Sequence, residues 1–174
     1  MEALRALKER IPDYAKDVRL NLDSVIGRSS LDAADAVGAA LAAAYAARSK
    51  PIVDVIRDSG AIDETDIQAV LSAAALMGMN NVWYPYVEMA NDEDLRTQRA
   101  ELRMNAYATH GGVDKKRFEL FSLAASIVGK CHYCVGSHYK MLKENGVTAQ
   151  QLRDVGRIAA VIAAAANVIA AEEA

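Results

Sequence analysis

Cys131 and Cys134 are the only two cysteines in the 174-residue chain, and they lie three positions apart. At the start of a helix, such a pair has its first sulfur near unpaired backbone amides and the positive end of the helix dipole, which favour the nucleophilic thiolate. The spacing also lets the sulfurs bond and cycle between dithiol and disulfide. Because a bond between near neighbours closes almost no loop, it adds little stability. The pair therefore predicts redox chemistry in a reducing compartment.

His138 and Glu119 are the titratable residues best spaced to act on these thiols. His138 lies four residues after Cys134, one turn further along the same helix face, and an imidazole exchanges protons near neutral pH. Glu119 belongs to the preceding predicted helix. If the chain turns back at Gly129 and Lys130, the carboxylate faces the imidazole and holds its tautomer. The spacing thus predicts a thiol, a base and an orienting carboxylate on two adjacent helices.

Each of these residues also has an alternative interpretation. The cysteines could be packing residues of an alanine-rich helix, and His138 or Glu119 could lie at the surface. Zinc binding is the main competing chemistry, because the two cysteines, His138 and His132 offer four ligands. Ligands three and four positions apart on one helix do not easily enclose a tetrahedral ion without a second segment. Thiol chemistry is therefore favoured, and no metal is predicted.

The composition indicates closely packed helices. Hydrophobic residues make up 52% of the chain, alanine supplies many of them, and alanine favours helix over strand. The net charge is −3 with both signs interspersed, which argues against a nucleic-acid partner. Residues 1–18 lack the features of a signal peptide, and the nearly uncharged stretch 158–171 is too short to span a bilayer. We expect a buried helix there, no membrane association and a cytoplasmic protein.

Capping residues, glycines and prolines predict where the helices begin and end. Gly78 and Gly129 are each expected to interrupt a helix, and Thr148 with Gln151 forms a predicted capping box. Residues 91–101 are charged and are expected to connect two halves. The expected helices are 12 onward, 29–48, 51–60, 63–77, 82–86, 114–129, 131–144 and 148 onward.

The C-terminal part of the chain repeats the plan of the part before it. With a shift of 51 positions, Asp114 falls on Asp63, and alanines and a glycine also coincide. This pattern predicts one all-α domain, 1–174, built from two related halves. The first half, about 1–100, carries no reactive groups, and the second, 101–174, carries the redox site. Two unrelated helix pairs remain the alternative.

The spacing of the reactive residues resembles a known family pattern. It consists of a glutamate, eleven residues, and then Cys-x-x-Cys-x-x-x-His, and it is matched by Glu119, Cys131, Cys134 and His138. The flanking segments that add to the likeness are 11–22, 77–84 and 102–105. The chain is similar to the alkyl hydroperoxidase D (AhpD) proteins of the carboxymuconolactone-decarboxylase-like group. This resemblance implies an all-helical fold of two related halves, assembled as a homotrimer.

The resemblance also implies a function and a role for each site residue. Family members are antioxidant enzymes that relay electrons from a dihydrolipoyl group to the peroxiredoxin AhpC and weakly reduce hydroperoxides themselves. The donor is carried by a lipoylated protein of the dihydrolipoamide acyltransferase type, and no cofactor is tightly bound. Cys134 would be the nucleophile that becomes a sulfenic acid or mixed disulfide, and Cys131 the resolving thiol and proton donor. Glu119 and His138 would form the proton relay.

Tyr133 is a departure from this family pattern. Well-known members carry a histidine immediately before the second cysteine, whereas here the histidine is one position earlier, at His132. One step along a helix turns a side chain by about 100°, so His132 is not an automatic substitute. Tyr133 could donate a hydrogen bond but would be a weak base at neutral pH. A second base in the relay is therefore in doubt.

Three other functions are compatible with a reactive cysteine pair. A general disulfide reductase without a dedicated peroxiredoxin would act on unrelated disulfides. A redox sensor would change its oligomeric state when the disulfide forms. Lactone decarboxylation, the other activity of the broader group, is disfavoured because that chemistry has no evident use for a disulfide.

Overall fold

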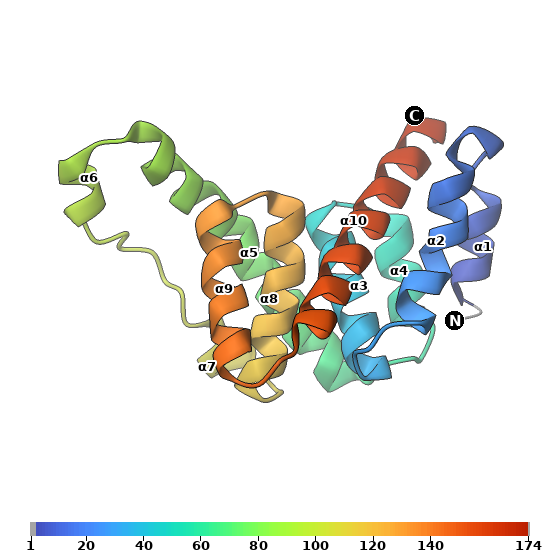
Figure 1. Ribbon diagram of the computed structural model, residues 1–174, viewed down its shortest axis with the longest axis horizontal. Helices are drawn as coiled ribbons and strands as arrows, with labels where there is room; N and C mark the ends of the chain where they lie inside the picture. Colours follow the sequence, from blue (N-terminus) through green and yellow to red (C-terminus); the bar gives the residue numbers. More distant parts are fainter. Residues whose placement is uncertain (1–2, 174) are drawn as a thin grey trace.

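A computed structural model describes residues 3–173, and within that range every regular element is helical (Figure 1). The helices are α1 (Ala3–Glu9), a 3-10 turn η1 (Asp13–Ala15), α2 (Lys16–Gly27), α3 (Ala33–Ala46), α4 (Lys50–Asp58), α5 (Glu64–Ala90), α6 (Glu93–Thr97), α7 (Ala106–His110), α8 (Lys115–Gly129), α9 (His132–Glu144) and α10 (Ala149–Glu172). The predicted all-α fold is confirmed.

The core is centred on α3, whose residues 36–44 are all buried. Helices α5, α8 and α10 each pack against α3, and α9 packs on the outside of α8. Small side chains let these helices approach closely. At Gly38, for example, an added Cβ would lie only 2.4 Å from the ring of Phe121 on α8. The core thereby fixes α8, which in turn supports α9 and the cysteine pair.

Most predicted helix ends are confirmed. Asp63, Asp114 and Thr148 each cap a helix, accepting a hydrogen bond from the backbone amide three residues on. The capping box of Thr148 with Gln151 is complete. Helix α8 ends at Gly129, as expected.

The predicted break at Gly78 is wrong, because α5 is one continuous helix of 27 residues. A single glycine inside a helix costs only about 1 kcal/mol, and no capping residue follows Gly78 to begin a new helix. Buried contacts of Met77 and Asn80 on either side hold the helix together. At Gly129, by contrast, Lys130 adopts a left-handed conformation and Cys131 caps the next helix. The unbroken α5 presents one continuous face to α9.

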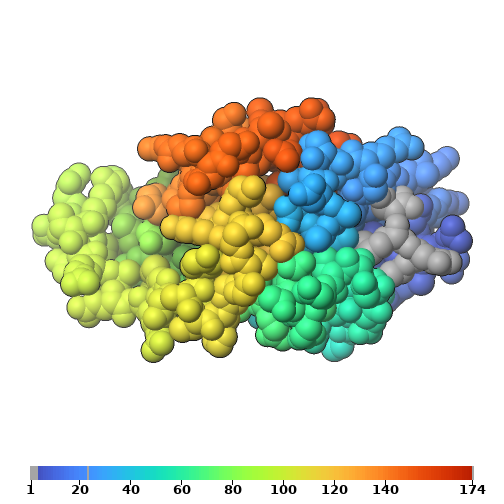
Figure 2. All heavy atoms as spheres, turned by 90° about the horizontal axis from the view of Figure 1, so that it is seen from below, coloured from blue at the N-terminus to red at the C-terminus, as the bar shows by residue number. Residues whose placement is uncertain are grey.

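An arm protrudes from the end of the molecule opposite α1 and α2. It consists of the last turns of α5, helix α6 and the extended segment 98–105 (Figures 1 and 2). The predicted connection 91–101 lies within it and contains the short α6. Val82, Tyr86 and Met89 are exposed along this part of α5, and the Met89 side chain is 78% exposed. This surface is unusually apolar for one that faces solvent.

The apolar stretch 158–171 lies in α10, and its predicted burial is confirmed. Within residues 3–173, α10 is the one helix long and apolar enough to cross a membrane by length and composition. It packs instead against α2, α3 and α8, with Ile158, Ile162 and Ile169 buried. This is the arrangement of a core helix.

Two pairs of positions related by the shift of 51 have matching or complementary roles. Asp63 and Asp114 both cap helices. Asp66 and Arg117 form a bidentate ion pair with N–O distances of 2.6 and 3.0 Å. Arg117 also donates to Asp35 on α3 at 2.6 Å. The hydrogen bond to Asp66, with that to Asp35, raises the pKa of Arg117 despite its partial burial. The ion cluster joins α3, α5 and α8, and the duplication itself stays a prediction.

Asp154 on α10 is a buried carboxylate whose loss should destabilise the fold. It accepts hydrogen bonds from the Ser30 amide and hydroxyl at 2.9 and 2.8 Å, and from Arg153 and Arg157. Burial pushes the pKa of Asp154 upward, but these hydrogen bonds outweigh it and hold the pKa well below its ordinary value. We expect Asp154→Asn to lower the free energy of unfolding by about 2–3 kcal/mol at pH 7.

The pH dependence of this effect has a definite sign. A carboxyl group with a depressed pKa in the folded state stabilises the fold above its unfolded pKa of about 3.9, and this contribution is lost as the pH falls further. Urea unfolding of both proteins should therefore show a difference at pH 7 that shrinks at pH 3. An equal difference at both values would contradict this role of the Asp154 charge.

Candidate active site

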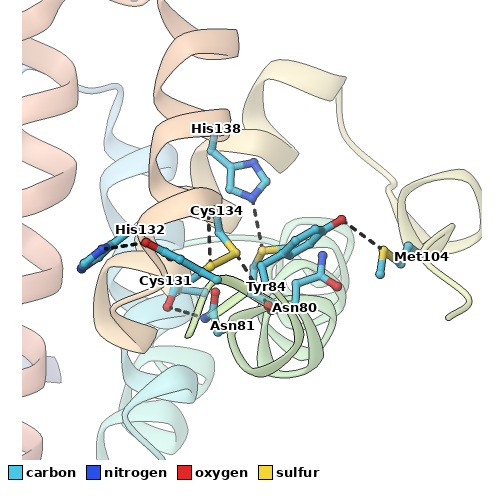
Figure 3. The surroundings of a disulfide bond; sticks show 11 residues. Asn80, Asn81, Tyr84, Met104, Cys131, His132, Cys134 and His138 are labelled. Carbon is cyan, nitrogen blue, oxygen red and sulfur yellow. Dashed lines mark hydrogen bonds and ion pairs between the residues drawn. A yellow bond between two sulfur atoms is a disulfide. The ribbon is translucent and has the colours of Figure 1, made fainter. Parts of the chain in front are cut away.

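Cys131 and Cys134 are joined in a disulfide at the start of α9, with their Cα atoms 5.3 Å apart (Figure 3). Cys131 is the N-cap residue of this helix, and its sulfur accepts a hydrogen bond from the Cys134 amide at 3.2 Å. The helix-start position expected from the sequence is therefore the observed one. Both residues are buried, with exposed fractions of 0% and 3%.

The turn that carries the disulfide is held by α5. The Cys131 amide donates to the Ser126 carbonyl, which closes the end of α8. Asn81 on α5 donates from its amide to the Ala125 carbonyl at 3.3 Å. Its side chain also fills the space beside Gly129, where an added Cβ would lie 2.1 Å from the Asn81 nitrogen. A larger residue at position 129 would force the Asn81 side chain to move.

A single face of α5 lies against the disulfide and α9. Met77, Asn80 and Tyr84 are spaced by three and four residues and therefore share this face. Asn80 and Tyr84 are seen beside the disulfide in Figure 3. The Cys134 sulfur is 3.8 Å from the Asn80 carbonyl oxygen. The side-chain oxygen of Asn80 is buried and has no hydrogen-bond partner within the described part of the chain. The sulfurs therefore lie in a polar but mostly enclosed space.

His138 contacts side chains from two other helices. Its Nδ1 lies 2.5 Å from Oε2 of Glu119 on α8, the contact that the turn at Gly129 predicts. Its Nε2 lies 3.2 Å from the sulfur of Met77 on α5. The His138 and Glu119 side chains are only 15% and 13% exposed, which strengthens their electrostatic interaction. The surface interpretation of these two residues is therefore excluded.

Tyr133 does not join the contact between His138 and Glu119. Its ring stacks on Tyr84 with centroids 4.4 Å apart, and most of its side chain is exposed. Burial and the neighbouring Tyr133 both raise the pKa of Tyr84, whose hydroxyl lies 3.8 Å from the sulfur of Met104. The exposed His132 has a different neighbour, Glu88, at 3.8 Å. Tyr133 and His132 therefore lie apart from the contact between His138 and Glu119.

The residues of the described range 3–173 include no cluster of three His, Cys, Asp or Glu side chains arranged for a metal ion. The two sulfurs are bonded to each other, and His132 lies 3.8 Å from Glu88 at the surface. The geometry is that of a cysteine pair joined in a disulfide, with the contact between His138 and Glu119 one helical turn away.

The chain is similar in sequence to known proteins along nearly its whole length. Residues 93–174 match the model of the carboxymuconolactone decarboxylase family. The alkyl hydroperoxide reductase AhpD of Rhodospirillum centenum is 45% identical over 99% of this chain and 93% of its own length. The AhpD proteins of Coxiella burnetii and Brucella canis are 39% and 40% identical, each over at least 95% of both chains.

The fold and the disulfide define the class: an all-helical protein with a Cys-x-x-Cys redox pair at a helix start. Within this class, the similarity along nearly the whole chain shows that it belongs to the alkyl hydroperoxide reductase AhpD family.

Proposed function

We propose that this protein is an antioxidant, thiol-dependent hydroperoxide reductase that cycles the Cys131–Cys134 disulfide. The observation that carries the proposal is the disulfide itself, which lies at a helix start one turn from the partly buried His138–Glu119 pair. Relatives that match nearly the whole chain carry the name alkyl hydroperoxide reductase, which supports the same reaction class.

In the oxidative half of the cycle, Cys134 is the nucleophile. Its thiolate attacks an oxygen of the hydroperoxide and the O–O bond breaks. The other oxygen takes a proton and leaves as a neutral alcohol, while Cys134 becomes a sulfenic acid. The thiolate of Cys131 then attacks the sulfenic sulfur, which forms the disulfide and releases water. Glu119 and His138 move the protons, with the carboxylate orienting the imidazole. Tyr133 has no assigned step, since its contact is with Tyr84.

In the reductive half, a dihydrolipoyl group supplies two electrons and two protons. Its two thiols exchange with the disulfide in turn, leaving the donor as a cyclic disulfide and the protein as a dithiol. We propose that the donor is carried by a lipoylated protein of the dihydrolipoamide acyltransferase type, and that no cofactor is tightly bound. The reduced protein passes the electrons to the peroxiredoxin AhpC. A reducing cytoplasm is the compartment in which this pair would cycle.

The test of this function is a coupled assay that follows NADH oxidation. It contains the protein, lipoamide with its dehydrogenase, a peroxiredoxin from the same source and an alkyl hydroperoxide. Turnover that requires both the protein and its two cysteines supports the relay. If there is no turnover when the thiols are reduced, a general disulfide reductase or a redox sensor becomes the better description.

We also propose that the protein assembles as a homotrimer through its protruding arm. The arm carries the exposed Met89 and an acidic run, Asp92–Asp94, at one end of the molecule. A hollow of about 630 Å³ between α3, α4 and α5 has Arg48 and Lys50 among its lining residues, together with apolar side chains. An arm from one copy could therefore meet an apolar, basic surface on the next.

Met89→Asp should convert such a trimer to monomers, since a charge would be buried at the contact. Light scattering after size exclusion should give three times the chain mass for the unmodified protein and one chain mass for the variant. Leu20→Asp, at an exposed apolar position on α2, is the matched control and should stay trimeric. If the unmodified protein is a monomer in this measurement, the proposed trimer is refuted.

A further inference from the structure

Met77 contacts His138 from a third helix, α5, outside the group of residues that the sequence identifies. Its sulfur lies 3.2 Å from Nε2, and its side chain is only 2% exposed. The other ring nitrogen, Nδ1, lies 2.5 Å from Glu119. In the disulfide form, both nitrogens of His138 are therefore engaged, one by α5 and one by α8.

The Met77 sulfur and the Glu119 carboxylate determine which ring nitrogens of His138 carry hydrogens. A thioether sulfur has no hydrogen to donate and can only accept. Nε2 must therefore carry a hydrogen and donate it toward Met77. A second hydrogen must lie between Nδ1 and the Glu119 oxygen, because two unprotonated acceptors would repel each other at 2.5 Å. In the disulfide form, His138 and Glu119 together hold two protons.

We propose that Met77 is a positioning residue, which holds His138 with a proton on Nε2 in the oxidised protein, ready to protonate the leaving thiolate during disulfide reduction. The proposal rests on the proposed function for the dithiol that reduces the site. It assigns the histidine an acid role in the reductive half of the cycle, before it acts as a base in the oxidative half.

The step balances in protons and electrons. A thiolate of the donor attacks one sulfur of the disulfide, the S–S bond breaks, and its electron pair goes to the other sulfur. That sulfur leaves as a thiolate and takes the Nε2 proton. His138 and Cys134 lie on consecutive turns of one helix face, so the proposed step requires the imidazole to rotate away from Met77 and bring Nε2 to the leaving sulfur. The pair of His138 and Glu119 then retains one proton and can accept another.

A spectroscopic test needs no variant. The chain has only three histidines, so nitrogen NMR of ¹⁵N-histidine protein at pH 7 can resolve His138. We expect a one-bond N–H coupling at Nε2 of His138 in the oxidised protein. An unprotonated Nε2 in that state would overturn the proposal, whatever the enzyme's activity.

Met77→Leu removes the acceptor sulfur with little change in volume, a swap that protein cores tolerate. It should weaken the Nε2–H signal and slow reduction of the disulfide by excess dihydrolipoamide about fivefold, the change expected from one hydrogen bond of ordinary net strength. The reaction of the reduced variant with hydroperoxide should slow less than disulfide reduction, because in that half-reaction His138 accepts a proton and needs no hydrogen held on Nε2.

Met79→Leu is the matched control, since position 79 is turned about 200° from position 77 on the same helix. It should keep both the Nε2–H signal and the rate of reduction. Equal slowing of both half-reactions by Met77→Leu, or no change in either, would contradict the positioning role. Failure of the unmodified protein to reduce hydroperoxide would count against the proposed function, and the NMR result would still decide the role of Met77.

Discussion

Cys134→Ser should lower dithiol-dependent hydroperoxide reduction at least about a thousandfold, because serine cannot supply a thiolate or form the disulfide. The expected loss is large because Cys134 has no substitute: Cys131 is the only other cysteine in the chain. The measurement is the steady-state rate of peroxide consumption with excess dihydrolipoamide. Circular dichroism should show an unchanged helical fold, since a bridge across three residues contributes little stability.

Cys131→Ser distinguishes the two cysteines. This variant keeps the proposed nucleophile and should consume one equivalent of hydroperoxide, leaving Cys134 as a sulfenic acid that a dimedone probe can trap. Repeated turnover should be lost, because no second thiol is present to resolve the sulfenic acid. If Cys134→Ser instead forms a sulfenic acid on Cys131 that dimedone traps, the assignment of the two cysteines is reversed.

Glu119→Gln should slow the reaction of the reduced protein with hydroperoxide by about 100-fold, the lower end of what a positioned proton relay contributes. Glutamine keeps the shape of the side chain but removes the charge that orients and stabilises His138. Stopped-flow measurement of thiol loss gives the rate directly. The contact is mostly shielded from solvent, with the two side chains 15% and 13% exposed and His138 Nδ1 2.5 Å from the carboxylate, so water cannot easily replace it.

Glu88→Gln is the control for this experiment. Glu88 also lies beside a histidine, His132, but both side chains are exposed, and such a contact contributes little. Its removal should leave the rate within about twofold. Similar losses in the two variants would show that the effect of Glu119 comes from its negative charge in general rather than from its contact with His138.

Local signals in the sequence are sufficient to predict the frame of the site. Capping residues at Asp114 and Thr148, and the glycine at the end of α8, mark helix ends that depend on nearby residues alone. The meeting of Glu119 with His138 also follows from a local turn, since the two residues lie on helices joined by Gly129 and Lys130.

The part contributed by α5 could not be predicted in the same way. Met77 and Asn80 lie more than 50 residues before the cysteines, and their contacts depend on how α5 packs against α9. Their spacing does contain a signal, because Met77, Asn80 and Tyr84 fall on one helix face. Because the sequence predicts a break at Gly78, it assigns these residues to separate segments and not to one helix face. Whether a lone glycine ends a helix depends on tertiary packing, which the local sequence does not contain.

The most direct test of the central proposal is a single-turnover experiment. Fully reduced protein is mixed with one equivalent of cumene hydroperoxide without any reductant, and thiols and alcohol are both counted. We predict that each chain loses both thiols, regains the Cys131–Cys134 disulfide and produces one molecule of alcohol. Unreacted hydroperoxide with both thiols still present would contradict the account and show that the cysteine pair serves another redox partner.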